Sequence, residues 1–79
     1  MAADELLGRI TTDPGIFGGK PIVRGMRVSV EHILKALAAG VPADELLADI
    51  PILEPDDIRA CLAYAAEVME EQSHFVVAR

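Results

Sequence analysis

The sequence is poor in the residues that small proteins use for cross-links, metal sites or membrane anchors. Cys61 is the only cysteine among 79 residues, so the chain forms no internal disulfide. Cys61, His32 and His74 are scattered and lack the spacing of metal ligands. No apolar run approaches the roughly 18 residues of a membrane span, and residues 1–8 lack a signal-peptide pattern. We therefore expect a cytoplasmic chain without metal or cofactor, in a compartment where a free cysteine stays reduced.

The length suffices for one domain with a modest core. Small scaffolds that lack disulfides and metals usually gain stability by association. Apolar residues make up 52% of the chain, which exceeds the globular average, and this surplus needs a surface to cover it. Size and composition therefore predict a homodimer, the commonest oligomer.

Charge is distributed unevenly along the chain. The net charge is −6, which argues against indiscriminate nucleic-acid binding. The segment 6–30 nevertheless carries four basic residues and one acid, whereas 31–79 carries three basic residues and ten acids. Such a molecule can present one face to an anion and another to a basic protein.

Turn signals dominate the first third of the sequence. Loops are marked by Asp13-Pro14-Gly15 and by Gly18-Gly19-Lys20-Pro21. Short β-prone pieces lie at 10–12, 22–24 and 26–30, and in the last piece apolar residues alternate with polar ones. These features predict a small β-hairpin or ribbon that needs the helices or another subunit for support.

Beyond the ribbon the hydrophobic period changes from two to 3.6. Ser29 is the expected N-cap of a first helix that ends at Gly40, and Pro42 and Pro55 open a second and a third helix. The apolar stripe of the third helix comprises Ile58, Cys61, Leu62, Ala65 and Met69. The predicted fold class is mainly α (α+β), a three-helix, helix-turn-helix-like domain with a small N-terminal β-hairpin or ribbon.

Three segments are expected along the chain. They are a flexible N-terminus over 1–8, a single helix-turn-helix-like domain over 9–71, and a C-terminal tail over 72–79. Phe75, Val76 and Val77 in the tail fit an added strand, a contact with a partner or a frayed end.

No group of residues has the pattern of an enzyme site. The glycines before Lys20 lack the spacing of a phosphate loop, and Pro21 stands where such a loop needs serine or threonine. Cys61 falls on an apolar helix stripe, so we expect a buried side chain and no nucleophile. His32 and His74 have no serine or cysteine motif near them. We therefore expect a non-catalytic domain without a small-molecule substrate.

Three basic residues of the ribbon are the candidates for binding nucleic acid. Lys20, Arg24 and Arg27 can project from the ribbon toward phosphates or toward carboxylates of a partner. Two other arrangements explain them as well: a solvated face, or pairing with the acids of the chain's own helices.

Charged residues at the start of the third helix are the candidates for binding a protein partner: Asp56, Asp57 and Arg59. Adjacent acids in a first turn also suit the helix dipole. If this helix were the recognition helix of a helix-turn-helix unit, its carboxylates would be repelled by the DNA phosphates. Either the ribbon would then contact DNA instead, or DNA is not the ligand.

Several motifs of the chain match those of a known family. They are GGKPIVRGMRVSV at 18–30, DELL at 44–47, PILEPDDIRA at 51–60 and LAYA at 62–65. With these motifs, over roughly residues 9–69, the chain resembles the domain of unknown function 433 family. The resemblance implies a helix-turn-helix fold with a short β segment, and kinship with VapB-like antitoxins, which often accompany a PIN-like ribonuclease toxin. The chain departs from the family pattern at Met26, Ser29 and Glu54, where threonine, proline and a threonine or serine cap are usual.

The charge pattern and the resemblance together predict an antitoxin-like module. Its acidic part would hold a basic, PIN-like toxin, and its basic ribbon would touch operator DNA. The alternative is a homodimeric protein–protein adaptor that never binds DNA, which the acidic start of the third helix favours.

Overall fold

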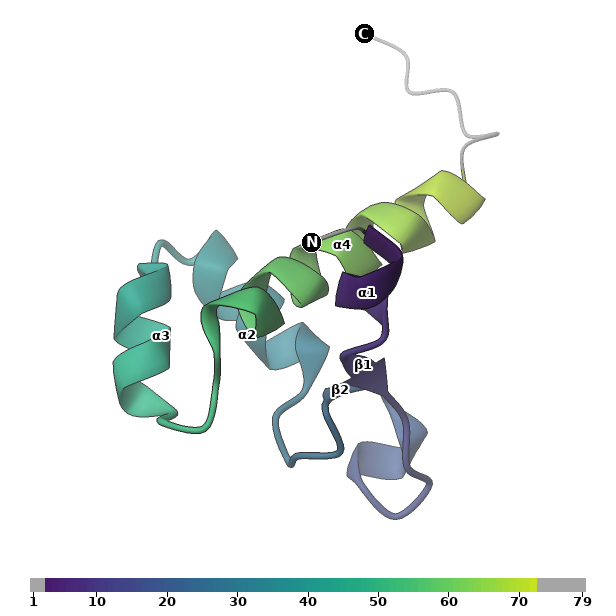
Figure 1. Ribbon diagram of the computed structural model, residues 1–79, viewed down its shortest axis with the longest axis horizontal. Helices are drawn as coiled ribbons and strands as arrows, with labels where there is room; N and C mark the ends of the chain where they lie inside the picture. Colours follow the sequence, from purple (N-terminus) through teal and green to yellow (C-terminus); the bar gives the residue numbers. More distant parts are fainter. Residues whose placement is uncertain (1–2, 73–79) are drawn as a thin grey trace, which may run out of the picture.

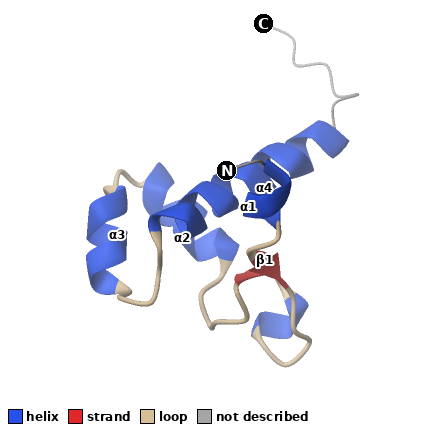
Figure 2. Ribbon diagram, in the orientation of Figure 1, coloured by secondary structure: helices blue, strands red, loops and turns tan. Residues whose placement is uncertain are grey.

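Helices surround a very small sheet in the computed structural model, which describes residues 3–72 (Figure 1). The elements in chain order are α1 (Ala3–Leu7), β1 (Ile10–Thr11), a 3₁₀ helix (Phe17–Gly19), β2 (Ile22–Val23), α2 (Val30–Ala38), α3 (Ala43–Asp49) and α4 (Pro55–Glu71). Figure 2 shows how little of this chain is strand. The predicted mainly α (α+β) fold class is confirmed. Among the described residues no helix is both long and apolar enough to span a membrane.

The ribbon is antiparallel and is extended by a tight turn. In the sheet Ile10 pairs with Val23 and Thr11 with Ile22. After β2 the chain reverses through a turn that the Met26 N–H closes by donating to the Val23 carbonyl over 2.8 Å. The two central residues, Arg24 and Gly25, have φ angles of 44° and 70°. Positive φ at both positions matches a type I′ turn, so Gly25 suits its place while Arg24 adopts a backbone that non-glycine residues rarely adopt.

The three predicted helices are present with their predicted boundary signals. The Ser29 hydroxyl accepts a hydrogen bond from the His32 N–H over 3.0 Å, as an N-cap does. Gly40 follows α2 with a φ of 91°, and Pro55 is the first residue of α4. Pro42, expected as the first residue of its helix, lies one residue earlier, at the N-cap of α3. Local sequence signals therefore account for both ends of α2 and for the starts of α3 and α4.

The hydrophobic core lies where α2, α3 and α4 meet the ribbon. Its buried members are Val23, Val30, Ile33, Leu46, Leu53, Ile58 and Cys61. The buried position of Cys61 agrees with the expectation from its place on an apolar stripe.

The N-terminal segment differs from the expectation of a flexible 1–8. Residues Ala3–Leu7 form α1, which packs on α4, and the Leu6 side chain is buried. Five residues are too few to show a helical period in the sequence. A helix this short is not stable alone, so α1 depends on packing against α4.

The apolar stripe predicted for α4 is partly wrong. Ile58 and Cys61 are buried, but Leu62 is 50% exposed and Met69 is 64% exposed. Ala60, on another side of the helix, is completely buried. Because α1 also packs on α4, the buried face of α4 is turned away from Leu62 and Met69.

The expectations for the C-terminal tail fall almost entirely outside the described residues. His74, Phe75, Val76 and Val77 all lie beyond residue 72, where α4 has already ended.

Candidate functional site

The register of the ribbon brings two arginines together. Arg9 directly precedes β1 and Arg24 directly follows β2, so the pairing of Ile10 with Val23 places them opposite each other. The Arg24 N–H donates to the Arg9 carbonyl over 2.7 Å. Like charges in opposite positions of a ribbon repel each other, so this arrangement requires a compensating anion.

Asp57, in the first turn of α4, supplies that anion. Its side chain is completely buried, and each carboxylate oxygen accepts two hydrogen bonds. Oδ1 accepts from Arg24 Nε over 2.9 Å and from an Arg9 guanidinium nitrogen over 3.0 Å. Oδ2 accepts from the second Arg24 nitrogen over 2.8 Å and from the Glu54 N–H over 2.8 Å. The carboxylate thus binds Arg24 in the bidentate manner and caps α4 at the same time.

Two further contacts complete this group, which we call the Asp57 cluster: Arg9, Arg24, Glu54 and Asp57. Arg9 also pairs with the Glu54 carboxylate over 2.6 Å. Arg24 donates to the Ile52 carbonyl in the connector before α4 over 2.8 Å. The cluster therefore ties β1, β2 and the α3–α4 connector to the start of α4.

Electrostatics keep the Asp57 carboxyl ionised. Burial by itself raises its pKa, but the hydrogen bonds from Arg24, the Glu54 N–H and Arg9 outweigh burial, and the pKa of Asp57 is lowered. The hydrogen bonds that Arg9 donates to carboxylates, above all to that of Glu54 and then to that of Asp57, correspondingly raise the pKa of Arg9. The charged form of Asp57 is thus the form that the fold requires.

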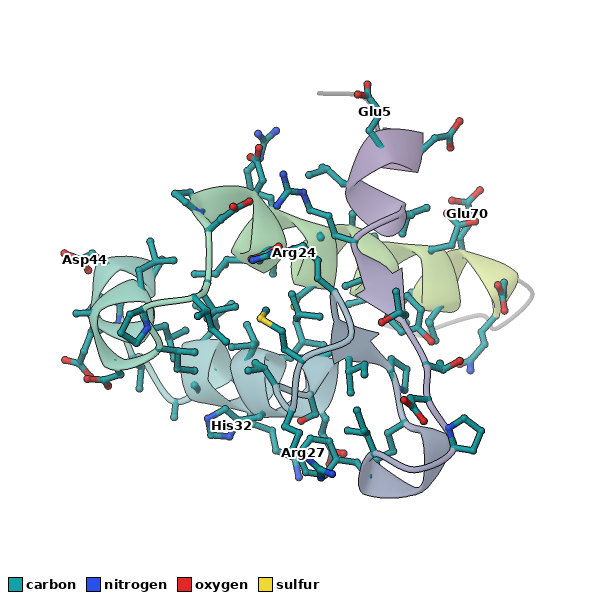
Figure 3. All side chains as sticks on the ribbon, turned by 60° about the horizontal axis from the view of Figure 1, so that its bottom comes forward. Glu5, Arg24, Arg27, His32, Asp44 and Glu70 are labelled. Atoms are coloured by element: carbon teal, nitrogen blue, oxygen red, sulfur yellow. The ribbon has the colours of Figure 1, made fainter. Side chains whose placement is uncertain are left out.

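Two of the three residues proposed for nucleic-acid contact are engaged inside the domain. Arg24 is bound by Asp57, and Lys20 pairs with Glu31 over 3.0 Å. Glu31 also pairs with Lys35 over 2.9 Å, and the two lysines, Lys35 foremost, lower its pKa to about 2. Arg27 is exposed and alone among the described basic residues makes no ion pair. Figure 3 shows Arg24 directed toward α4 and Arg27 at the edge of the molecule beside His32.

The residues proposed for partner contact also change role. Asp57 is buried, which corrects its assignment to a partner surface, because its oxygens are already satisfied by Arg9, Arg24 and Glu54. Asp56 pairs with Arg59 on the same helix over 3.2 Å and is only partly exposed. Arg59 remains accessible on the surface of α4.

Sequence reasoning missed an acidic surface on α3. Asp44, Glu45 and Asp49 are all exposed on α3, and none of them makes an ion pair within residues 3–72. In the connector after α3, Ile52 is 59% exposed. Two acids in a first turn suit the helix dipole, and this ordinary explanation hid them as candidates.

The one cysteine has no catalytic surroundings. Burial raises the pKa of the Cys61 thiol to about 11, and the nearby Asp57 charge adds to the rise. At neutral pH the side chain is therefore a thiol, which is a weak nucleophile. Among residues 3–72 there is no group of three side chains that could hold a metal ion.

Comparison with known proteins places this arrangement in a family. Residues 10–65, which span both ribbon strands and the cluster residues Arg24, Glu54 and Asp57, match the family described as "Protein of unknown function (DUF433)". The chain belongs to the DUF433 family. The resemblance drawn from the sequence motifs is thereby confirmed at the level of the family.

Two similar proteins extend the comparison. An uncharacterised protein, y4eO of Sinorhizobium fredii, is 39% identical over 56 residues, which are 71% of this chain and 25% of that protein. This chain thus spans about a quarter of the length of that curated relative. The crystal structure of a DUF433 member protein from Anabaena variabilis is 30% identical, with a TM-score of 0.74. The alignment covers 89% of this chain and 69% of that one.

Replacing Asp57 with asparagine should lower the free energy of unfolding at pH 7 by about 2–3 kcal/mol, because it removes the anion between two arginines. The cost is not larger because both guanidinium groups are partly exposed and can turn toward water. Urea denaturation followed by circular dichroism measures the loss.

The difference in unfolding free energy between the native protein and Asp57→Asn depends on pH. Because folding lowers the pKa of Asp57, its stabilisation is complete above the unfolded-chain value near 4 and is lost as the pH falls through the folded-state pKa. The stability gap between the native protein and Asp57→Asn should therefore close in acid. Asp56→Asn is the matched control and should change stability little, because Asp56 makes a surface pair with Arg59. Equal losses from Asp56→Asn and Asp57→Asn would refute the role assigned to the cluster.

Proposed function

We propose that this domain is a non-catalytic, antitoxin-like protein-binding module that holds a basic partner through the exposed acids of α3. The observation that carries the proposal is the division of charge between paired and unpaired residues. Every described lysine and arginine except Arg27 pairs with an acid of the same chain, whereas several exposed acids make no ion pair within the described part of the chain, and three of these, Asp44, Glu45 and Asp49, lie together on α3. The charge available to a partner on this side of the molecule is therefore negative.

The shape of the α3 region supports a protein as the partner. Leu46 anchors α3 in the core while its acids face solvent, so the acids sit on a fixed element. The exposed Ile52 in the adjoining connector offers apolar area near the same helix. Arg24 fixes this connector by its hydrogen bond to the Ile52 carbonyl. A rigid surface that combines charge with an exposed aliphatic side chain suits protein recognition, in which charge favours the encounter and apolar contacts add affinity.

The antitoxin assignment rests on this acidic surface and on the motif resemblance. A basic, PIN-like ribonuclease is the partner that the resemblance suggests, and a row of carboxylates complements such a protein. The much greater length of y4eO fits a module that also works as part of longer proteins.

Neutralising the α3 acids should release the partner. We expect the full chain, tagged and recovered from its native cells, to retain a small basic protein in stoichiometric yield. The variant Asp44→Asn/Glu45→Gln/Asp49→Asn should reduce that yield at least about tenfold, and higher salt should release the partner from the unmodified chain. Mass spectrometry identifies and quantifies the retained protein.

The matched control removes three carboxylates elsewhere. Asp4→Asn/Glu67→Gln/Glu71→Gln makes the same change in net charge on α1 and α4 and should leave retention unchanged. The α3 variant loses two acids that stabilise the N-terminus of its helix. Circular dichroism therefore has to show that both variants are folded. Recovery of the chain without a partner, or equal retention by both variants, would contradict the proposal.

Operator DNA is a second candidate ligand, favoured by Arg27. This residue is exposed, carries no ion pair and lies beside the exposed His32 at one edge of the domain (Figure 3). A single unpaired arginine gives weak phosphate contact unless a second copy adds its own. DNA contact of this kind therefore depends on a dimer.

The DNA hypothesis has its own variant. Arg27→Glu should abolish retention of the duplex upstream of the protein's own gene in a low-salt gel-shift assay, while Lys35→Glu should preserve it. Arg27 is suited to this test because its replacement leaves the Asp57 cluster intact. If the unmodified protein shifts no duplex at low salt, the domain binds protein only.

A further inference from the structure

One face of α4 is exposed although its side chains are largely apolar. It consists of Arg59, Leu62, Ala66, Met69 and Glu70, all exposed to solvent. Leu62 and Met69 are among the large hydrophobic residues with the highest exposure, at 50% and 64%. We call this set the α4 stripe.

The spacing of the stripe is that of a helix-pairing seam. Residues 59, 62, 66 and 69 follow each other at intervals of three and four, the a and d positions of a heptad. At about 100° per residue all five members fall within an arc of about 100° on the helix. The small side chain of Ala66 lies at the middle of the seam, where it allows two helices to approach closely. Figure 1 shows the C-terminal half of α4 extending away from α2 and α3, so this part of the helix is open to a neighbour.

Charge at the two ends of the stripe selects the direction of pairing. Arg59 and Glu70 lie on the same flank of the helix and are separated by about 16 Å along its axis. Arg59 also pairs with Asp56 of its own helix over 3.2 Å, but its side chain is 58% exposed, and an exposed pair of this kind is weak enough to exchange for a partner on a second copy. In an antiparallel pair of identical helices, each flank of one helix faces the equivalent flank of the other helix. This arrangement places Arg59 of one chain against Glu70 of the other. Two-fold symmetry makes this contact twice. A parallel pair would instead bring like charges to the same level along the axis, with Arg59 near Arg59 and Glu70 near Glu70.

We propose that the α4 stripe is the dimer surface of this protein, and that a second copy of the chain covers it with its own α4 in antiparallel orientation. Leu62 of each chain packs between Ala66 and Met69 of the other, and the Arg59–Glu70 pairs close both ends. The acids of α3 lie at the opposite end of the molecule from the C-terminal part of α4 (Figure 1). Dimerisation and the proposed partner binding therefore use separate surfaces and are testable separately.

The decisive experiment is a charge exchange in the full chain, followed by analytical ultracentrifugation over a range of concentrations. Arg59→Glu should raise the dimer dissociation constant about tenfold, because repulsion replaces attraction at two symmetric contacts. Arg59→Glu/Glu70→Arg should return the constant to within about threefold of the original value, because the double exchange restores both pairs. Arg27→Glu makes the same charge change outside the stripe and should leave the constant unchanged.

An apolar comparison tests the seam itself. Leu62→Lys should give a monomer, whereas Ile52→Lys, at a side chain of similar exposure in the α3–α4 connector, should remain dimeric. A monomeric native chain at all concentrations would overturn the proposal. A dimer that resists Arg59→Glu and Leu62→Lys would overturn it as well, and so would a double exchange that fails to restore association in a protein that remains folded by circular dichroism.

Discussion

The buried carboxylate of Asp57 holds together two arginines that the ribbon would otherwise force into repulsion. The register of β1 and β2 places Arg9 beside Arg24, and the turn requires Arg24 to adopt a positive φ of 44°. Both features are unfavourable alone. Four hydrogen bonds to one carboxylate offset them, and the same carboxylate caps α4 through the Glu54 N–H. A ribbon of two-residue strands has little stability of its own, so its position on the helices depends on this contact.

The cluster also decides which charges are available for binding. It takes up Arg9 and Arg24 from the basic part of the sequence, and the pairing of Lys20 with Glu31 takes up a third cation. The basic front half of the sequence therefore does not produce a basic face. Among the exposed groups that remain are Arg27 at one edge, the acids of α3 at one end and the α4 stripe near the other (Figure 3). The proposed partner binding uses acids that folding leaves unpaired, and the proposed dimer uses exposed side chains of α4, of which only Arg59 has an ion-pair partner among the described residues of its own chain, Asp56.

The helices and the ribbon could be predicted from the sequence because their signals are local. Ser29, Gly40 and Pro55 mark boundaries through backbone geometry that each residue carries with it. The position of α1 could not be predicted in this way, because five residues gain helical structure only by docking on α4. That omission explains the error over Leu62 and Met69: without α1 the buried face of α4 is assigned to the wrong side of the helix.

The charged site was harder to predict for a similar reason. Intramolecular pairing of the ribbon cations was one of three arrangements that the sequence allowed, and only the tertiary contact between Arg24 and Asp57, separated by 33 positions, distinguishes them. Asp56 and Asp57 look alike in the sequence, but they point in directions about 100° apart around α4, so that Asp57 is buried against the ribbon and Asp56 stays near solvent. The α3 acids differ from Asp57 in lacking a tertiary partner among residues 3–72, and the sequence does not show which acids have one.

A double-mutant cycle between Arg24 and Asp57 tests the central claim most directly. The free energy of unfolding is measured by urea denaturation for the native chain, Arg24→Gln, Asp57→Asn and the double variant. Strong coupling is expected, because either change alone already breaks the bidentate pair. The loss of unfolding free energy in the double variant should be smaller than the sum of the two single losses, by an amount that corresponds to at least about tenfold in the unfolding equilibrium constant. Additive effects would show that Arg24 and Asp57 contribute independently, and would contradict the dependence of the fold on their contact.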